Sequence, residues 1–181
     1  MQSLLTTIGY HVGRYGPLFL GVIVTYLLWP LQIKRDVFIV GFIINLLING
    51  ALKLLIKQRR PDKHKSDSLL SAFLDTSKPK KMDKNEAVAH SYGMPSGHAQ
   101  SVIYCLAYIM YTLQSSIITL FFLFFALWTC IQRVVFKRHY VDQVIVGALV
   151  GFMLAYYSYK LSLALVEKKN KKNEINKYFT S

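Results

Sequence analysis

Three groups of polar residues interrupt an otherwise apolar chain, and their side chains suit chemistry on a phosphate group. Arginine and lysine bind phosphoryl oxygens through charge-assisted hydrogen bonds. An imidazole can donate a proton or act as a nucleophile near neutral pH. In chain order, the groups are Lys53 with Arg60-Pro61, then Pro95-Ser96-Gly97-His98, then Arg133 with His139. The combination predicts a site that binds phosphate and transfers it.

The first group lies at the end of an apolar stretch. Seven residues are about two turns of helix, so we expect Lys53 and Arg60 on one helix face. Pro61 disfavours the helical conformation of the residue before it, so the helix should end there and let Arg60 turn inward. Asn45 and Asn49 extend the polar stripe along the same helix. The alternative is that both cations only reach for lipid headgroups.

The second group opens another apolar stretch. We expect Ser96 to cap the helix and Gly97 to leave the backbone N–H groups open to close approach. A helix N-terminus with free N–H groups attracts phosphate. His98 would stand beside it and give a proton to a leaving oxygen. The alternative is an ordinary capped helix with a histidine at the membrane interface.

The third group pairs a cation, Arg133, with a candidate nucleophile, His139. If a helix begins at His139, residues three and four positions later share its face. Either Asp142 or Gln143 could then accept a hydrogen bond from one ring nitrogen and aim the other outward. Both stay candidates. The alternative is a basic loop that meets only headgroups.

Composition indicates where these groups lie. The chain has 181 residues, enough for one domain, and 53% are hydrophobic while 17% are charged, yet its formal net charge is +13. Basic loops between apolar segments are typical of a membrane protein. A nucleic-acid-binding protein would line a folded surface with its cations, so we expect no nucleic-acid partner. Cys105 and Cys130 fall inside apolar runs and are expected to be small buried residues.

Five apolar stretches have about the length that crosses a bilayer. We therefore predict an all-α, polytopic transmembrane bundle, with a membrane-embedded domain over residues 1–166 and a basic, solvated or frayed tail over 167–181. A polar loop with room for a short helix covers 61–94. The expected spans are residues 17–33, 37–56, 99–114, 116–131 and 139–166.

Five spans place the long polar loop, the connection from Arg133 to His139 and the N-terminus on one side of the membrane. The three polar groups therefore meet at one face, although they are far apart in sequence. Gly147 and Gly151 have a spacing that permits close helix packing or a homodimer. The cations Lys34 and Arg35 and the Lys-rich tail favour the opposite side as cytoplasmic. The site would then face a lumen or the exterior.

The three groups resemble the signature motifs of the type 2 phosphatidic acid phosphatase (PAP2) superfamily, over residues 41–155. The resemblance implies that His139 forms a phosphohistidine and that His98 protonates the leaving group. It implies no metal and no other cofactor. The residues that would hold the phosphoryl oxygens are Lys53, Arg60, Ser96, Gly97 and Arg133.

Two positions depart from the family pattern, which has Ser where Gln132 stands and Asp where Gln143 stands. Gln at the second position is similar to dolichyl diphosphate phosphatases and favours a polyprenyl diphosphate held in the bilayer. The alternatives are a phosphatidate or other glycerolipid phosphatase, and a catalytically silent membrane protein that binds lipid phosphate. The composition resembles homologues carried by large DNA viruses, so the expected location is the endoplasmic reticulum or a viral or host membrane.

Overall fold

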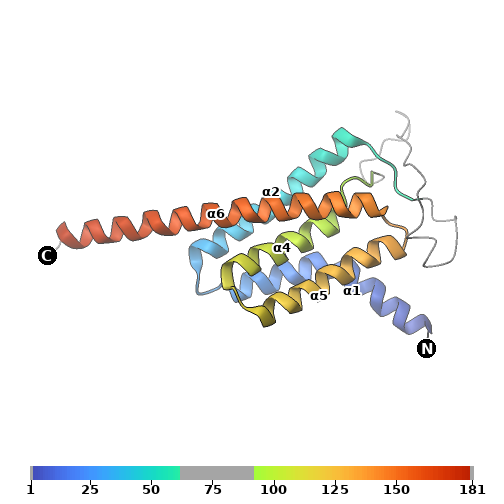
Figure 1. The fold of residues 1–181 in the computed structure, drawn as a ribbon, viewed down its shortest axis with the longest axis horizontal. Helices are drawn as coiled ribbons and strands as arrows, with labels where there is room; N and C mark the ends of the chain where they lie inside the picture. Colours follow the sequence, from blue (N-terminus) through green and yellow to red (C-terminus); the bar gives the residue numbers. More distant parts are fainter. Residues whose placement is uncertain (1, 62–91, 180–181) are drawn as a thin grey trace.

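The computed structural model of the chain describes residues 2–61 and 92–179. Those residues form five α-helices and no β-strand, with one isolated antiparallel bridge between Arg59 and Tyr92 (Figure 1). The predicted all-α bundle is confirmed. The helices are α1 (Gln2–Leu27), α2 (Gln32–Ile56), α4 (Gly97–Leu113), α5 (Ser116–Val135) and α6 (Val141–Phe179).

The outer surface of the bundle is apolar. Among the described residues, the helices long and apolar enough to cross a membrane are α2, α5 and α6. Large side chains on these helices point outward, such as Leu55 on α2 and Ile117 on α5, which are 78% and 82% exposed. Such exposure would be costly in water and is expected against lipid. α4 has 17 residues, is shorter than these three, and contacts all four other helices.

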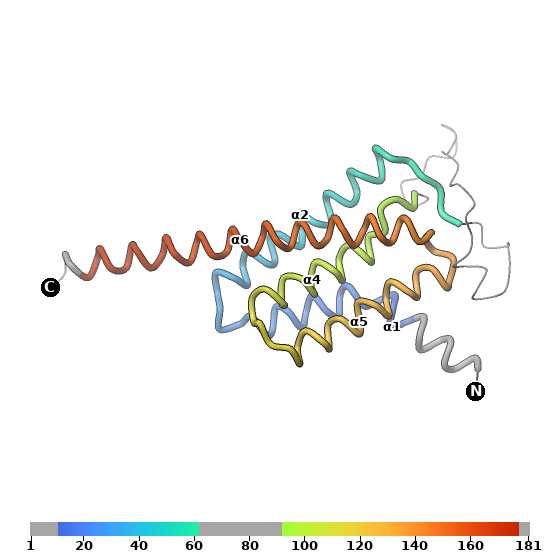
Figure 2. The backbone as a smooth tube through the Cα atoms, viewed as in Figure 1, coloured from blue at the N-terminus to red at the C-terminus, as the bar shows by residue number. Residues whose placement is uncertain are grey.

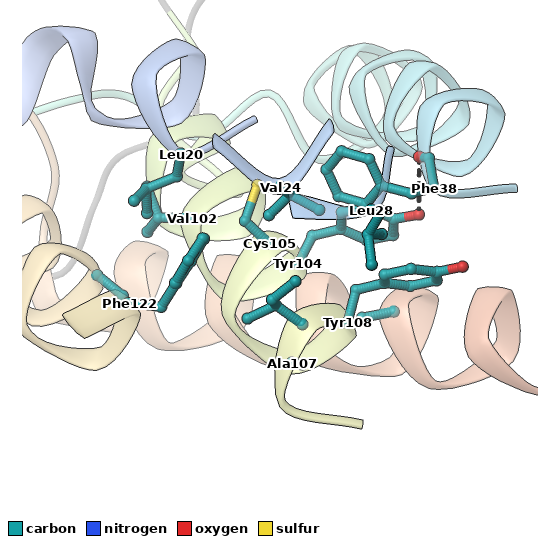
Figure 3. Packing of buried hydrophobic residues seen from close by; sticks show 13 residues of the cluster. Leu20, Val24, Leu28, Phe38, Val102, Tyr104, Cys105, Ala107, Tyr108 and Phe122 are labelled. Carbon is teal, nitrogen blue, oxygen red and sulfur yellow. Dashed lines mark hydrogen bonds between the residues drawn. The ribbon is translucent and has the colours of Figure 1, made fainter. Parts of the chain in front are cut away.

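The hydrophobic core forms where α1 and α2 meet α4. Figure 3 shows Leu20 and Val24 of α1, and Leu28 just after its end, at four-residue intervals beside side chains of α4. The ring of Tyr104 lies 5.6 Å from that of Phe38, and its hydroxyl donates to the Phe38 carbonyl oxygen at 3.3 Å. The core thus fixes α4 against both N-terminal helices.

Glycines bring α4 and α6 close together. A Cβ atom on Gly147 would lie 2.5 Å from the Ser96 carbonyl oxygen, and one on Gly151 would overlap the Gln100 carbonyl oxygen. The small-residue spacing predicted from the sequence therefore serves packing inside the chain. A homodimer stays a prediction that would need another face.

The first predicted span is wrong at both ends. α1 begins at Gln2 and continues past Pro17, and it ends at Leu27, before Pro30. Proline lacks the N–H that a helix interior needs, and it restricts the residue before it. The chain therefore turns at residues 28–31 and starts α2 at Gln32, five residues before the predicted start.

The basic tail is helical, which the sequence did not predict. α6 continues to Phe179, and its side chains from Glu167 to Lys177 are exposed, so the segment is solvated but not frayed. Lys171 Nζ lies 2.7 Å from Glu167 Oε1 one turn earlier, a pairing that supports an exposed helix. The short helix expected in the polar loop falls on residues 62–91, outside the described residues.

One end of the bundle collects the chain segments that carry the polar groups. The end of α2, the start of α4 and the connection from α5 to α6 lie there, while the α1–α2 turn and the C-terminal end of α6 lie at the other end (Figures 1 and 2). The fold therefore brings the three polar groups to one end of the bundle, as the sequence predicted.

Candidate active site

A pocket of about 360 Å³ opens at this end of the bundle. Its walls come from all five described helices or their connections. Six of the nine predicted site residues line it: Lys53, Arg60, Gly97, His98, Arg133 and His139. Ser96, Asp142 and Gln143 are not among the lining residues. Side chains that sequence reasoning did not assign to the site complete the walls: Arg14, Tyr15, Pro17, Leu18, Leu46, Asn49 and Ser101.

Lys53 and Arg60 converge on one backbone oxygen. Lys53 Nζ lies 3.4 Å from the Tyr92 carbonyl oxygen, and Arg60 Nε lies 3.3 Å from the same atom. They do not share a helix face as predicted, because α2 ends at Ile56, where Lys57 adopts a left-handed conformation with φ of 51°. The bridge between Arg59 and Tyr92 then brings Arg60 back to the pocket.

α4 begins directly after Ser96, as predicted, but the Ser96 side chain does not have the predicted capping role. Ser96 occupies the N-cap position in an extended conformation, but its side chain makes no capping hydrogen bond. In the part of the chain that the structure describes, its hydroxyl is buried without a hydrogen-bond partner. Gly97 lines the pocket, where a Cβ would come within 2.8 Å of Asn49 Oδ1. A glycine here keeps the helix N-terminus open to an anion.

The ring of His139 is held by two oxygen atoms. Its Nδ1 lies 2.9 Å from the Gly93 carbonyl oxygen and 3.2 Å from Gln143 Oε1. Both oxygens only accept hydrogen bonds, so in the neutral ring Nδ1 carries the hydrogen and Nε2 carries the lone pair. The side chain lines the pocket, which makes Nε2 the nitrogen available to a ligand.

The amide of Gln143 is itself oriented. Its Nε2 donates to the Arg59 carbonyl oxygen at 2.8 Å and to Gln58 Oε1 at 3.0 Å, so Oε1 must face His139. Asp142 is exposed and lies elsewhere: its Oδ1 accepts from the Gln143 backbone N–H at 2.7 Å. Of the two candidates for the partner of His139, the structure thus places Gln143 against the ring. α6 begins at Val141, two residues later than the start predicted at His139, yet the contact between His139 and Gln143 still forms.

Burial and positive charge keep His139 neutral. The pKa of His139 is lowered well below its ordinary value of 6.5, first by burial and then by the charges of Arg60 and Lys53. The pKa of Arg60 is also lowered, by burial and by Arg138. A buried imidazole surrounded by cations favours its neutral form, which is the form of a histidine that can act as a nucleophile.

His98 is oriented by a backbone atom of α1. Its Nε2 lies 3.0 Å from the Arg14 carbonyl oxygen. A carbonyl only accepts, so Nε2 carries a hydrogen, and Nδ1 is the nitrogen that can exchange a proton with a ligand. Sequence reasoning missed the part of α1 that precedes Pro17, because the predicted span began there, and a backbone contact has no side-chain signature.

A buried hydrogen-bond network joins α2 to α4 beneath the pocket. Asn49 Nδ2 donates to Gln100 Oε1 at 2.7 Å, and Gln100 Nε2 donates to Asn45 Oδ1 at 3.0 Å. Asn45 Nδ2 in turn donates to Ser101 Oγ at 3.3 Å. The predicted polar stripe on α2 therefore faces α4, where these bonds compensate for burying amides in an apolar bundle.

Within the described ranges, no three His, Cys, Asp or Glu side chains are grouped as a metal site would need. The charged residues that line the pocket are all cationic: Arg14, Lys53, Arg60 and Arg133. Such a pocket attracts a multiply charged anion.

Comparisons with known proteins give this geometry a context. The sequence model of the PAP2 superfamily matches residues 37–167. A protein of Saccharomyces cerevisiae named dolichyldiphosphatase is 29% identical over 143 residues. That match covers 72% of this chain and 54% of the yeast protein, so the chain spans about half the length of this relative.

Two crystal structures share the fold. Aquifex aeolicus LpxE superposes with a TM-score of 0.62 at 19% identity, covering 87% of this chain and 86% of that one. A transmembrane PAP2 type phosphatidylglycerolphosphate phosphatase from Bacillus subtilis superposes with a TM-score of 0.63 at 20% identity. This second match covers 93% of this chain and 79% of the other.

Proposed function

The chain belongs to the PAP2 superfamily, and from this premise we propose that it is a membrane phosphatase acting on lipids through a phosphohistidine on His139. The observation that carries the proposal is the state of the His139 ring. Its Nδ1 is bound by the Gly93 and Gln143 oxygens, so Nε2 holds a lone pair beside a cationic pocket.

The reaction has two steps. In the first, Nε2 of His139 attacks the terminal phosphorus, and the bond from phosphorus to the leaving oxygen breaks with its electron pair on that oxygen. His98, with a hydrogen on each ring nitrogen at this stage, supplies the one on Nδ1 to the leaving oxygen. In the second, water attacks the phosphorus of the phosphohistidine and gives a proton to Nδ1 of His98. The bond from phosphorus to Nε2 of His139 breaks with its electron pair on Nε2, and inorganic phosphate and the neutral imidazole are released.

The cationic side chains supply the charge stabilisation that a metal supplies in other phosphatases. Lys53, Arg60 and Arg133 line the pocket, and the N-terminus of α4 adds backbone N–H groups at Gly97. Fixed cations and dipoles of this kind stabilise the charge that develops on the phosphoryl oxygens. We therefore expect activity without any added metal.

An apolar groove beside the pocket supports a lipid substrate. It has a volume of about 380 Å³ and lies between α1 and α2 on the outer face of the bundle. Pro17 and Leu18 line both the groove and the polar pocket, so the two spaces adjoin. A headgroup in the pocket and a hydrocarbon chain in the groove would keep the tail in contact with the bilayer.

A polyprenyl diphosphate is the substrate class that the name of the yeast relative favours. That relative is named dolichyldiphosphatase, and Gln143 resembles the residue of dolichyl diphosphate phosphatases at this position. A glycerolipid phosphate is the alternative substrate with the same chemistry, and a silent lipid-phosphate binder is the alternative without chemistry.

The test is phosphate release by the protein purified in detergent, with chelator present. We expect chelator-resistant release from geranylgeranyl diphosphate and less from phosphatidate, and no release by His139→Ala. Circular dichroism of His139→Ala serves as the control for folding. Release that stops with chelator would contradict the metal-free mechanism. Binding of lipid phosphate without any release would instead favour the silent binder.

A further inference from the structure

Arg14 lines the active-site pocket from a helix that the family model does not cover. The pocket includes Arg14 and Tyr15 of α1, whereas the match to the superfamily begins at residue 37. The Arg14 guanidinium carbon lies 5.7 Å from the centroid of the Tyr15 ring, a stacking arrangement that still leaves the side chain exposed to a ligand. Arg14 is thus a fourth cation that belongs to this chain and not to the shared motifs.

The backbone of Arg14 contacts the residue assigned as the acid, and its side chain lines the same pocket. The Arg14 carbonyl oxygen lies 3.0 Å from Nε2 of His98, the residue assigned as the acid for the leaving oxygen. Lys53 and Arg60 meet instead at Tyr92, next to Gly93, whose carbonyl oxygen holds His139. Lys53 and Arg60 are thus linked to the nucleophile through residues 92 and 93, whereas Arg14 is the pocket cation whose own backbone contacts the acid.

The two substrate classes differ in what occupies the leaving-group side. A lipid monophosphate leaves as an alcohol, whose oxygen needs a proton as its bond to phosphorus breaks. A lipid diphosphate leaves as a lipid monophosphate: the bond from the terminal phosphorus to the bridging oxygen breaks, and the electron pair stays on a phosphate group. That leaving group is already a stable anion, so a cation helps it more than an acid does.

We propose that Arg14 is a specificity-determining residue that binds the inner phosphate of a lipid diphosphate. The inference rests on the phosphatase function proposed above and deepens it. It explains why a pocket that already holds Lys53, Arg60 and Arg133 contains one more arginine beside the acid. An arginine fork suits a phosphate that has two free oxygens, which the inner phosphate of a diphosphate offers and an alcohol oxygen does not.

The experiment compares two substrates with the same tail, geranylgeranyl diphosphate and geranylgeranyl monophosphate. Arg14→Gln should lower kcat/KM for the diphosphate by about 10- to 100-fold, the loss expected of one charge-assisted contact, and should change it for the monophosphate by less than about threefold. His98→Asn should show the opposite preference, with the larger loss on the monophosphate. Arg14→Lys should recover part of the diphosphate activity.

Arg35→Gln is the matched control, since Arg35 lies at the opposite end of the bundle, paired with Asp36 at 3.0 Å. It should leave both substrates unaffected. The monophosphate rate of Arg14→Gln reports on folding within the same preparation. Equal losses on both substrates, or no loss on either, would overturn the role of Arg14 while the phosphatase function stands. A wild-type protein that cleaves neither substrate would overturn both proposals.

Discussion

At the scale of single residues, the amide of Gln143 does part of what a carboxylate would do. It accepts a hydrogen bond from Nδ1 of His139 and so selects the ring nitrogen that faces the pocket. An amide adds no negative charge, however, so it does not stabilise the imidazolium form as strongly as aspartate would. The resting state of this site is therefore a neutral nucleophile beside a high local density of cations.

Replacing Gln143 should reduce the rate of the chemical step. Gln143→Leu removes the acceptor at 3.2 Å from Nδ1 and leaves the Gly93 carbonyl oxygen alone to orient the ring, so we expect kcat to fall about tenfold with a smaller change in KM. Asp142→Asn is the control, because Asp142 is exposed and contacts the Gln143 backbone instead of His139. A larger loss in Asp142→Asn than in Gln143→Leu would contradict this assignment.

The cations should set the pH at which His139 protonates. Because Arg60 is one of the charges that lower the pKa of His139, Arg60→Gln should raise that pKa toward 6.5. The neutral nucleophile then disappears at a higher pH as the solution is acidified. Nitrogen chemical shifts of ¹⁵N-histidine-labelled protein in micelles would follow the titration, with His139→Asn to assign the signal. An unchanged or lower midpoint in Arg60→Gln would refute the electrostatic explanation.

At the scale of elements, the site depends on how closely α4 approaches α6. Gly147 and Gly151 lie against backbone carbonyls of α4, and the Ser96 N–H donates to the Gln143 carbonyl oxygen at 2.9 Å. The start of α4, which carries His98, is in this way joined to the start of α6, which carries Gln143. Any change that separates the two helices would also displace the acid relative to the nucleophile.

A single methyl group should be enough to disturb this packing. In Gly151→Ala, the new Cβ would overlap the Gln100 carbonyl oxygen, a backbone atom that cannot rotate away. We expect a loss of about 1–3 kcal/mol in stability, the usual cost of overpacking. Gly50→Ala is the matched control, since nothing lies within 4 Å of its added Cβ and alanine favours the helix. Thermal unfolding in detergent should separate the two variants; similar midpoints would contradict the packing argument.

The presence of the helices was easier to predict than the residues at which they end or the atoms that contact the site histidines. Apolar runs are long enough to specify α2 and α5, but Pro30 ends α1 early and Lys57 ends α2 four residues before Pro61. The motif residues were predictable because their side chains carry the chemistry. The Gly93 carbonyl on His139 and the Arg14 carbonyl on His98 were not, because every residue has a carbonyl and only the fold decides which one comes close.

At the scale of the whole molecule, the two ends differ in shape and charge. α6 has 39 residues, which span roughly 58 Å at an ordinary helical rise, against a hydrocarbon core of about 30 Å. Its C-terminal part is exposed, carries lysines and lies at the end opposite the pocket. The bundle therefore presents a basic helix on one side of the membrane and a cationic pocket on the other.

The basic helix should lie in the cytoplasm. Lysines near a span favour the cytoplasmic side, so Lys172→Cys should react with a membrane-impermeant maleimide once the plasma membrane alone is permeabilised. The unmodified chain is the control for Cys105, which is buried, and Cys130, which is half-buried. Labelling of Lys172→Cys in intact cells, or only after the internal membranes are also permeabilised, would place the pocket on the cytoplasmic side instead.

Every amino acid supplies a main-chain carbonyl, so the bond from position 14 to His98 is indifferent to mutation at that position. A lineage can therefore exchange the side chain there without passing through an ancestor whose acid is misplaced. The headgroup preference of such a chain could drift, or diverge after gene duplication, by one replacement at a time. The side chain at position 14 can therefore change the headgroup preference, while the backbone carbonyl at the same position keeps His98 in place.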